Sequence, residues 1–159
     1  MLAGFLLAVG TIGMSSTALA NPVLPDTAIS PLPTYTNFSS SCESIALYAT
    51  QAIHRLPDQL KARCRDNAGV LHSAEIDLNL CVGINYQNAS LLWSIYGKFS
   101  EYCSSCWSAG TRVEFGCACR LLTGNATKIS TNSTLDLDTG IGNVNGTLHC
   151  AGGIGSRGD

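Results

Sequence analysis

The stretch that decides the fold is residues 133–150, which read S-T-L-D-L-D-T-G-I-G-N-V-N-G-T-L-H-C. Its beginning alternates apolar and acidic residues one by one, as a half-buried strand requires, and a glycine-containing connection leads to a second short apolar run. A looser copy occupies residues 74–93, about sixty positions earlier. Asp77 and Asp136 hold matched positions in the two copies, which indicates a repeated turn hydrogen bond rather than a catalytic carboxylate pair.

The repeat extends upstream of both copies. F-S-S-S-C at residues 38–42 recurs as F-S-E-Y-C at 99–103, and C-R at 64–65 recurs at 119–120. Residues 60–65 alternate apolar and basic side chains, which predicts an amphipathic strand. Two copies are too few for an open solenoid, which needs about three to bury a continuous core. We therefore predict an all-β (mostly β) fold, one pseudo-symmetric duplicated domain.

This ordered series of motifs, present twice over residues 38–150, resembles the cyanovirin-N lectin family. The run N-V-N-G-T-L at 143–148 matches the family pattern best. The resemblance implies a cyanovirin-N-like domain of three-stranded sheets and β-hairpins, in which strands of one repeat complete the other half. It also implies a mannose-binding cleft near either end, and hence a carbohydrate-binding protein whose partners are oligosaccharides or glycoproteins.

Residues 1–20 have the pattern of a signal peptide. An apolar stretch at 2–14 precedes an A-x-A motif at 18–20, which indicates cleavage after Ala20. The stretch is shorter than the roughly twenty apolar residues of a membrane span. We expect a secreted, extracellular protein with no membrane span after signal cleavage, rather than one held by an anchor.

Residues 21–34 form a Pro-rich arm, since they hold four of the five prolines in the chain. Proline fixes φ and removes a backbone donor, so the arm is expected to lie extended on the surface. The cyanovirin-N-like domain is expected over residues 35–150, a length suited to one modest core. Residues 151–159 are predicted to be a flexible tail, and we interpret their final R-G-D as part of it rather than as a cell-adhesion tripeptide.

Charge and composition narrow the range of partners. The formal net charge is −2, charged residues are 13% of the chain, and no run of lysine or arginine occurs, so binding to nucleic-acid phosphates is disfavoured. Five N-x-S/T sequons predict an N-glycosylated, secreted protein. The predicted glycosylation sites are Asn37, Asn88, Asn125, Asn132 and Asn145.

Eight cysteines in a secreted chain of this size predict a disulfide framework. The symmetry of the repeat pairs Cys42 with Cys64 and Cys103 with Cys119, and the family resemblance implies the same two bridges. The four cysteines without a counterpart in the other repeat are Cys81, Cys106, Cys117 and Cys150.

The pairing of these four remains open, but one arrangement is favoured. Cys117 and Cys119 are two apart and point to the same face of one strand, so their sulfurs are expected to bond different neighbours. We therefore favour Cys81 with Cys106 and Cys117 with Cys150.

The cysteine spacing also suits a zinc site, because a C-x-x-C pair at 103–106 is followed by two more cysteines. Oxidation along a secretory route and the pairing from the repeat argue against it, so no metal and no cofactor are predicted. The three histidines are far apart in sequence and no nucleophile motif accompanies them, so an enzyme is not expected.

A lectin cleft needs amides, hydroxyls and other polar groups, because sugar hydroxyls are neutral donors and acceptors. The family resemblance implies two such clefts in this chain. The first would consist of Ser40, Ser41, Arg65, Asn67 and Asn143. The second would consist of Asn88, Lys98, Glu101 and Arg120. It departs from the family pattern, since Ala89 replaces a turn glycine and the loop is longer.

The alternative function is a secreted, disulfide-stabilised scaffold that binds a protein partner and has no sugar affinity. On composition alone, the polar groups of these loops are better explained as turn residues, and the family resemblance reverses that preference in favour of a lectin. Binding of a mannose disaccharide would separate them.

Overall fold

A computed structural model describes residues 34–49, 56–108, 112–122 and 128–158. All of these residues belong to one compact unit, Pro31–Asp159. The predicted signal peptide (1–20), nearly all of the Pro-rich arm (21–34) and the sequon at Asn125 lie outside the described residues. Within the ranges given above, no helix has the length and apolar character needed to cross a membrane.

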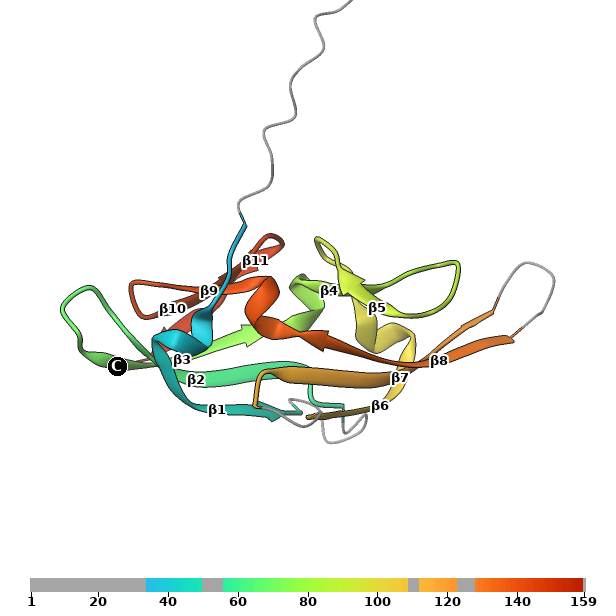
Figure 1. Ribbon diagram of the computed structural model, residues 1–159, viewed down its shortest axis with the longest axis horizontal. Coiled ribbons are helices and arrows are strands. Elements are labelled where there is room, and N and C mark those ends of the chain that lie inside the picture. The colour runs from blue at the N-terminus through green and yellow to red at the C-terminus, as the bar shows by residue number, and fades with distance from the viewer. Residues whose placement is uncertain (1–33, 50–55, 109–111, 123–127, 159) are drawn as a thin grey trace, which may run out of the picture. The chain divides into compact units, whose positions relative to one another are not determined.

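The described residues form the same series of 3-10 helices and strands twice (Figure 1). The first copy contains η1 (Phe38–Ser40), β1 (Cys42–Tyr48), β2 (Gln59–Arg65), β3 (Leu71–Asp77), η2 (Leu78–Leu80), β4 (Val82–Ile84) and β5 (Leu91–Trp93). The second copy contains η3 (Phe99–Glu101), β6 (Cys103–Ser108), β7 (Glu114–Leu122), β8 (Lys128–Asp136), η4 (Leu137–Thr139), β9 (Ile141–Val144) and β10 (Thr147–Cys150). The equal order confirms the duplicated, mostly β fold.

Each copy contributes one antiparallel sheet and one hairpin. The sheets contain β1-β2-β3 and β6-β7-β8, and the hairpins are β4-β5 and β9-β10. Both first strands have a register shift, between Glu43 and Ala46 in one copy and between Cys103 and Ser105 in the other. The hairpin of each copy packs on the sheet of the other, because β10 contacts β3 and β5 contacts β8. The expected completion of each half by the other repeat is therefore confirmed.

The C-terminal residues extend this plan beyond the repeat. β11 (Gly153–Ile154) pairs with β10, and β12 (Ser156–Gly158) pairs antiparallel with β3, so the first sheet has four strands. The prediction of a flexible tail over residues 151–159 is wrong for this segment. Its glycines permit close backbone contact, since a Cβ at Gly152 would overlap the carbonyl oxygen of Leu80.

Alternation along the strands places the core as predicted. In β2, Leu60, Ala62 and Cys64 are buried, whereas Lys61 and Arg63 are exposed. Burial of the apolar face of such a strand contributes roughly 25 cal/mol for each Å² of apolar surface removed from water. The strand therefore belongs to the sheet that covers the core.

The repeated phenylalanines provide the largest buried side chains. Phe38 and Phe99 hold equivalent positions in η1 and η3, and both are fully buried. The Phe99 ring packs edge-on against Phe115, with ring centroids 5.1 Å apart. Each buried ring of this size stabilises the fold by roughly 2–3 kcal/mol, so the F-S motif anchors both halves.

Turn residues at matched positions join the two copies. Asp77 Oδ1 accepts from the Asn79 N–H at 2.8 Å, and Asp136 Oδ1 accepts from the Asp138 N–H at 3.0 Å. The Asp138 carboxylate in turn accepts from the Ser39 N–H of the first copy at 3.0 Å, and η3 makes the equivalent bond to Asn79. The interpretation of Asp77 and Asp136 as turn residues is confirmed.

All eight cysteines are disulfide-bonded, as Cys42–Cys64, Cys103–Cys119, Cys106–Cys117 and Cys81–Cys150. The first two bridges confirm the pairing expected from symmetry. The predicted pairs Cys81 with Cys106 and Cys117 with Cys150 are wrong. Because every sulfur is bonded, no thiolate is left for the alternative zinc site.

The register shift in β6 explains the error. Residues three apart in a regular strand point to opposite faces, but the shift between Cys103 and Ser105 turns Cys106 to the same face as Cys103. Cys106 then lies directly opposite Cys117, with the Cα atoms 4.0 Å apart. The two sulfurs of β7 do bond different neighbours, yet both neighbours belong to β6.

Candidate functional site

Asn143, in β9, joins two other residues of the first predicted cleft. Its Nδ2 donates to the hydroxyl oxygen of Ser41 at 2.9 Å and to the carbonyl oxygen of Arg65 at 2.8 Å. Its Oδ1 accepts from the N–H of Gly146 at 2.9 Å. One amide thus connects the start of β1, the end of β2 and the β9–β10 turn. We name this cluster site one and define it by the residues Ser41, Arg65, Asp66, Asn67, Asn143 and Asn145.

The loop between β2 and β3, residues 66–70, forms one wall of site one. The Asp66 Oδ1 atom accepts from the N–H groups of Ala68 and Val70, both at 2.9 Å. Gly69 permits the tight turn because its φ is +82°. The pKa of Asp66 lies below its usual value. The largest cause is the hydrogen bond from the Val70 N–H, and the next is the hydrogen bond with His72. The carboxylate is therefore ionised at neutral pH.

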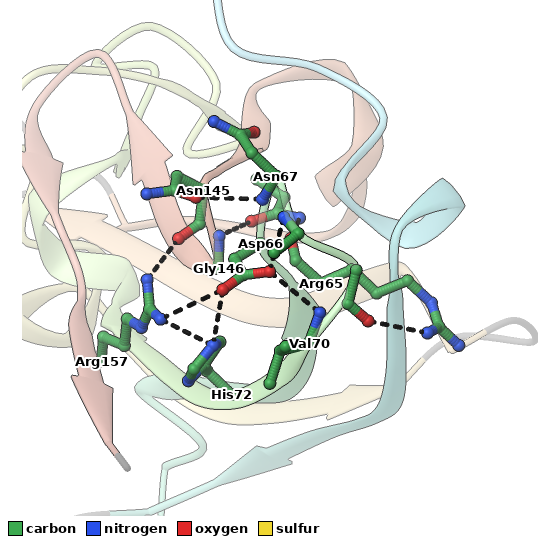
Figure 2. Close-up of polar contacts among 11 residues, drawn as sticks. Arg65, Asp66, Asn67, Val70, His72, Asn145, Gly146 and Arg157 are labelled. Atoms are coloured by element: carbon green, nitrogen blue, oxygen red, sulfur yellow. Dashed lines mark hydrogen bonds and ion pairs between the residues drawn. The ribbon is translucent and has the colours of Figure 1, made fainter.

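The turn between β9 and β10 forms the second wall. Asn145 and Gly146 have φ values of 52° and 83°, as a two-residue N-G hairpin turn of type I′ requires. Asn145 Oδ1 accepts from the N–H of Asn67 at 3.0 Å, as Figure 2 shows. This bond connects the two walls directly.

A third segment, β12, reaches the same cluster (Figure 2). Arg157 Nη1 donates to the carbonyl oxygen of Asn145 at 2.7 Å, and its Nη2 lies 3.5 Å from Asp66 Oδ2. His72 Nε2, on β3, lies 2.9 Å from the same Asp66 oxygen. Sequence motifs do not point to these residues, because Asp66 has only the turn signal of D-N-A-G and lies 91 positions from Arg157.

The structure brings together four of the five residues predicted for the first cleft, namely Ser41, Arg65, Asn67 and Asn143. The fifth, Ser40, lies in η1, and its hydroxyl donates to the carbonyl oxygen of Asn37 at 2.8 Å. Arg65 and Asn67 are exposed. Site one therefore presents amide, hydroxyl and guanidinium groups in a hydrogen-bonded frame, which suits a neutral ligand with many hydroxyls.

Of the four residues predicted for the second cleft, Lys98 and Glu101 contact each other, whereas Asn88 and Arg120 make separate contacts. Lys98 Nζ lies 3.5 Å from Glu101 Oε1, and Arg120 Nη2 lies 3.5 Å from the hydroxyl of Ser104. Asn88 Oδ1 accepts from the N–H and the hydroxyl of Ser90, at 3.0 and 2.7 Å. In the part of this region that the structure describes, no side chain takes the joining role that Asn143 has in site one.

One difference between the copies explains why no side chain that the structure describes joins the residues of the second predicted cleft. Ile84 lies opposite Leu91 in the first hairpin, as Asn143 lies opposite Leu148 in the second, so Ile84 holds the position of Asn143. Ile84 is buried and has no polar side-chain group. The second predicted cleft therefore lacks the amide that organises site one.

A pair of tyrosines is the other difference. The Tyr102 carbonyl accepts from the Arg120 N–H, as the Ser41 carbonyl accepts from the Arg65 N–H, so Tyr102 holds the position of Ser41. The Tyr86 ring packs edge-on against Tyr102 with centroids 5.8 Å apart, and the two hydroxyl oxygens are 3.2 Å apart. The hydrogen bond with Tyr86 raises the pKa of Tyr102. Tyr102, packed against Tyr86, thus stands where the first copy has the small polar side chain of Ser41.

A pocket of about 260 Å³ lies between Tyr35, Trp93, Ile95 and Thr139. The Trp93 Nε1–H donates to the Thr139 hydroxyl at 3.0 Å. The residues that line this pocket belong neither to site one nor to the second predicted cleft. Over the described ranges, no group of three or more His, Cys, Asp or Glu side chains is placed to hold a metal ion.

A family model described as the CVNH domain matches residues 34–149. The chain belongs to the CVNH family. This assignment confirms the resemblance to cyanovirin-N that the repeated motifs indicated. No curated protein matches the chain.

Solved CVNH structures have the same fold. A variant of MoCVNH3 in complex with (N-GlcNAc)4 is 18% identical, with 74% of this chain and 99% of that chain covered and a TM-score of 0.58. TbCVNH of T. borchii is 24% identical, with 72% and 98% covered and a TM-score of 0.53. Microvirin in complex with mannobiose is 22% identical, with 72% and 98% covered and a TM-score of 0.50. The CVNH family thus includes proteins solved with bound sugars.

Proposed function

We propose that this CVNH protein is a secreted lectin that binds mannose-type oligosaccharides, free or on glycoproteins, through site one. The observation that carries the proposal is the Asn143 cluster, in which one amide joins Ser41, Arg65 and the β9–β10 turn. The family match and the N-V-N-G-T-L run support the same function. The A-x-A motif at 18–20 and the four disulfides support secretion.

The frame of site one favours binding because it is formed before the ligand arrives. The bond between Asn67 and Asn145 holds loop 66–70 against the β9–β10 turn. Ordering a side chain on binding costs about 0.5–1.5 kcal/mol. A sugar that meets exposed groups on this frame loses less of its interaction free energy to such ordering.

Mannose-type sugars are the proposed ligands because the resemblance to the cyanovirin-N family implies them and because the CVNH-fold protein microvirin was solved with mannobiose. We propose one working site per chain, since Ile84 and the pair of Tyr86 and Tyr102 stand where the second cleft would need small polar groups. The resemblance predicted Asn88, Lys98, Glu101 and Arg120 as the ligands of that second cleft, and sugar titration tests that prediction through the number of sites per chain.

Calorimetric titration of mannobiose into the enzymatically deglycosylated protein tests the function. We expect saturable binding with one site per chain, and much weaker binding of the glucose disaccharide cellobiose as a control. N-acetylglucosamine oligomers serve as a second comparison. Absence of binding at millimolar mannobiose would favour the alternative function, a scaffold that binds a protein partner.

The sequons bear on site one because one of them belongs to it. Four predicted glycosylation sites are exposed in the structure, namely Asn37, Asn88, Asn132 and Asn145. Asn145 uses its Oδ1 to bind Asn67, and its amide nitrogen would carry the glycan. A glycan there would stand on the rim of the proposed sugar site.

Removing the sequon at Asn145 is expected to raise the affinity of the glycosylated protein for mannobiose by about tenfold, because a bulky glycan obstructs the site. Thr147→Ala is the suitable change, since it destroys N-G-T but keeps Asn145 and its bond to Asn67. Calorimetry on wild type and variant from one glycosylating host measures the effect, and mass spectrometry measures occupancy. The two proteins should bind equally when made without glycosylation. Equal affinities despite full occupancy at Asn145 would contradict the masking.

A further inference from the structure

The C-terminal strand lies beyond the region that matches the CVNH family, residues 34–149, yet it reaches site one. β12 pairs with the edge of β3, with Arg157 opposite Ala74 and Gly158 opposite Ser73. Figure 2 shows the Arg157 side chain extending from this strand toward the Asp66 carboxylate and the Asn145 carbonyl. A segment outside the family pattern therefore takes part in the site.

Arg157 binds both walls of site one at once. Its Nη1 donates to the Asn145 carbonyl at 2.7 Å, while its Nη2 lies 3.5 Å from Asp66 Oδ2 and 2.6 Å from His72 Nε2. A guanidinium stays charged and directs its donors in a rigid planar fork, so it fixes the separation of two acceptors. The side chains of Arg157 and Asp66 are only 35% and 14% exposed, so water screens this pair less than a fully exposed one.

These contacts also bear on the R-G-D tripeptide at the end of the sequence. The backbone of Gly158 is paired with β3, and the Arg157 guanidinium already has acceptors in site one. An arginine that binds a receptor would first have to leave those acceptors. The geometry therefore favours a role inside this domain.

We propose that Arg157 is a positioning residue for sugar binding and that β12 is the segment that delivers it. Arg157 acts through Asp66 and Asn145, and it sets the separation of loop 66–70 from the β9–β10 turn. The exposed Asn67 lies on that loop, and the central Asn143 accepts from the Gly146 N–H of that turn, so the spacing of the two residues follows from it. The proposal rests on the proposed function of site one.

Sugar titration of two Arg157 variants tests the proposal. Arg157→Ala is expected to weaken mannobiose binding about tenfold, because the two walls lose their common partner. Arg157→Lys keeps the charge but lacks the planar fork, so an intermediate loss of about threefold is expected. The matched control is Arg63→Ala, which removes an exposed arginine of the same sheet that pairs with Glu43 at 3.8 Å. This control should bind like wild type.

Amide hydrogen exchange supplies a readout that general destabilisation would not reproduce. In Arg157→Ala, the N–H groups of Asn67 and Gly146 should exchange about tenfold faster. Their acceptors are the side chains of Asn145 and Asn143, which lie in the hairpin whose Asn145 carbonyl Arg157 holds. The N–H of Ala118, in the sheet of the second copy, should keep its wild-type rate. Faster exchange throughout the domain would overturn a positioning role, since it would show a purely structural one.

The outcomes separate the two proposals. If wild type binds mannobiose and Arg157→Ala binds it equally well, the positioning role is overturned and the lectin function stands. If wild type binds no sugar, the lectin function fails, and hydrogen exchange alone tests whether Arg157 holds the two walls together. Unchanged exchange at Asn67 and Gly146 then overturns the proposal that Arg157 holds the two walls together, and a local increase supports that part of the proposal alone.

Discussion

Asn143→Ala is expected to reduce mannobiose affinity at site one about 100-fold, to the limit of detection by calorimetry. The change leaves the Ser41 hydroxyl, the Arg65 carbonyl and the Gly146 N–H without the partners that now hold them together. Each polar group that loses its partner costs about 1–3 kcal/mol where water cannot replace that partner fully. The site then loses both its central amide and its preorganised shape.

Two further variants sharpen this test. Asn143→Asp keeps an acceptor for the Gly146 N–H but has no N–H to donate to the Arg65 carbonyl, so it should also lose most of its affinity. Asn132→Ala removes an exposed asparagine of β8 outside site one and should bind like wild type. Amide NMR spectra establish that each variant is folded. Full mannobiose affinity in a folded Asn143→Ala protein would contradict the assignment of site one.

Loss of the Cys81–Cys150 bridge is expected to have the largest effect on stability. Its cysteines are 69 positions apart, and they connect the first copy to the second, whereas each other bridge lies within one copy. The chain-entropy estimate for a loop of this length is about 4 kcal/mol of stabilisation. We expect the double change Cys81→Ala, Cys150→Ala to lower the free energy of unfolding by about that amount.

Denaturant titration of the double variant measures this loss. The matched control replaces Cys106 and Cys117, which are 11 positions apart and close a much shorter loop. The same estimate gives about 3 kcal/mol for that bridge, so the control should unfold at higher denaturant than the Cys81 and Cys150 variant. Non-reducing peptide mapping of wild type adds a direct check, and a peptide linking Cys81 to Cys106 would contradict the structure.

Much of the fold could be predicted because the signals are local. The alternation at residues 60–65 specifies a strand with one buried face, and the structure has β2 there. Asp77 and Asp136 place their turns through bonds to the backbone two residues ahead. In a duplicated sequence, equivalent residues of the two copies are expected to make equivalent contacts. The bridges Cys42–Cys64 and Cys103–Cys119 could therefore be predicted from symmetry.

The remaining bridges could not be predicted, because they depend on strand register. One extra residue in β6 reverses the face on which Cys106 lies. No pattern in the sequence S-S-C-W predicts that register shift. Cys81 and Cys150 come within 5.9 Å between Cα atoms only because each hairpin packs on the sheet of the other copy. Register and packing are properties of two segments together.

By itself, the sequence determined the duplicated β domain. It also carried the family resemblance that implied Ser41, Arg65, Asn67 and Asn143 as site residues. Tertiary structure alone decided that β12 pairs with the open edge of β3 and brings Arg157 to Asp66. The physical reason is that an unpaired strand edge accepts any segment whose backbone can approach it. The identity of that segment depends on close contact at glycines such as Gly155, whose Cβ would overlap the Glu75 carbonyl oxygen, and no periodicity in either partner encodes it.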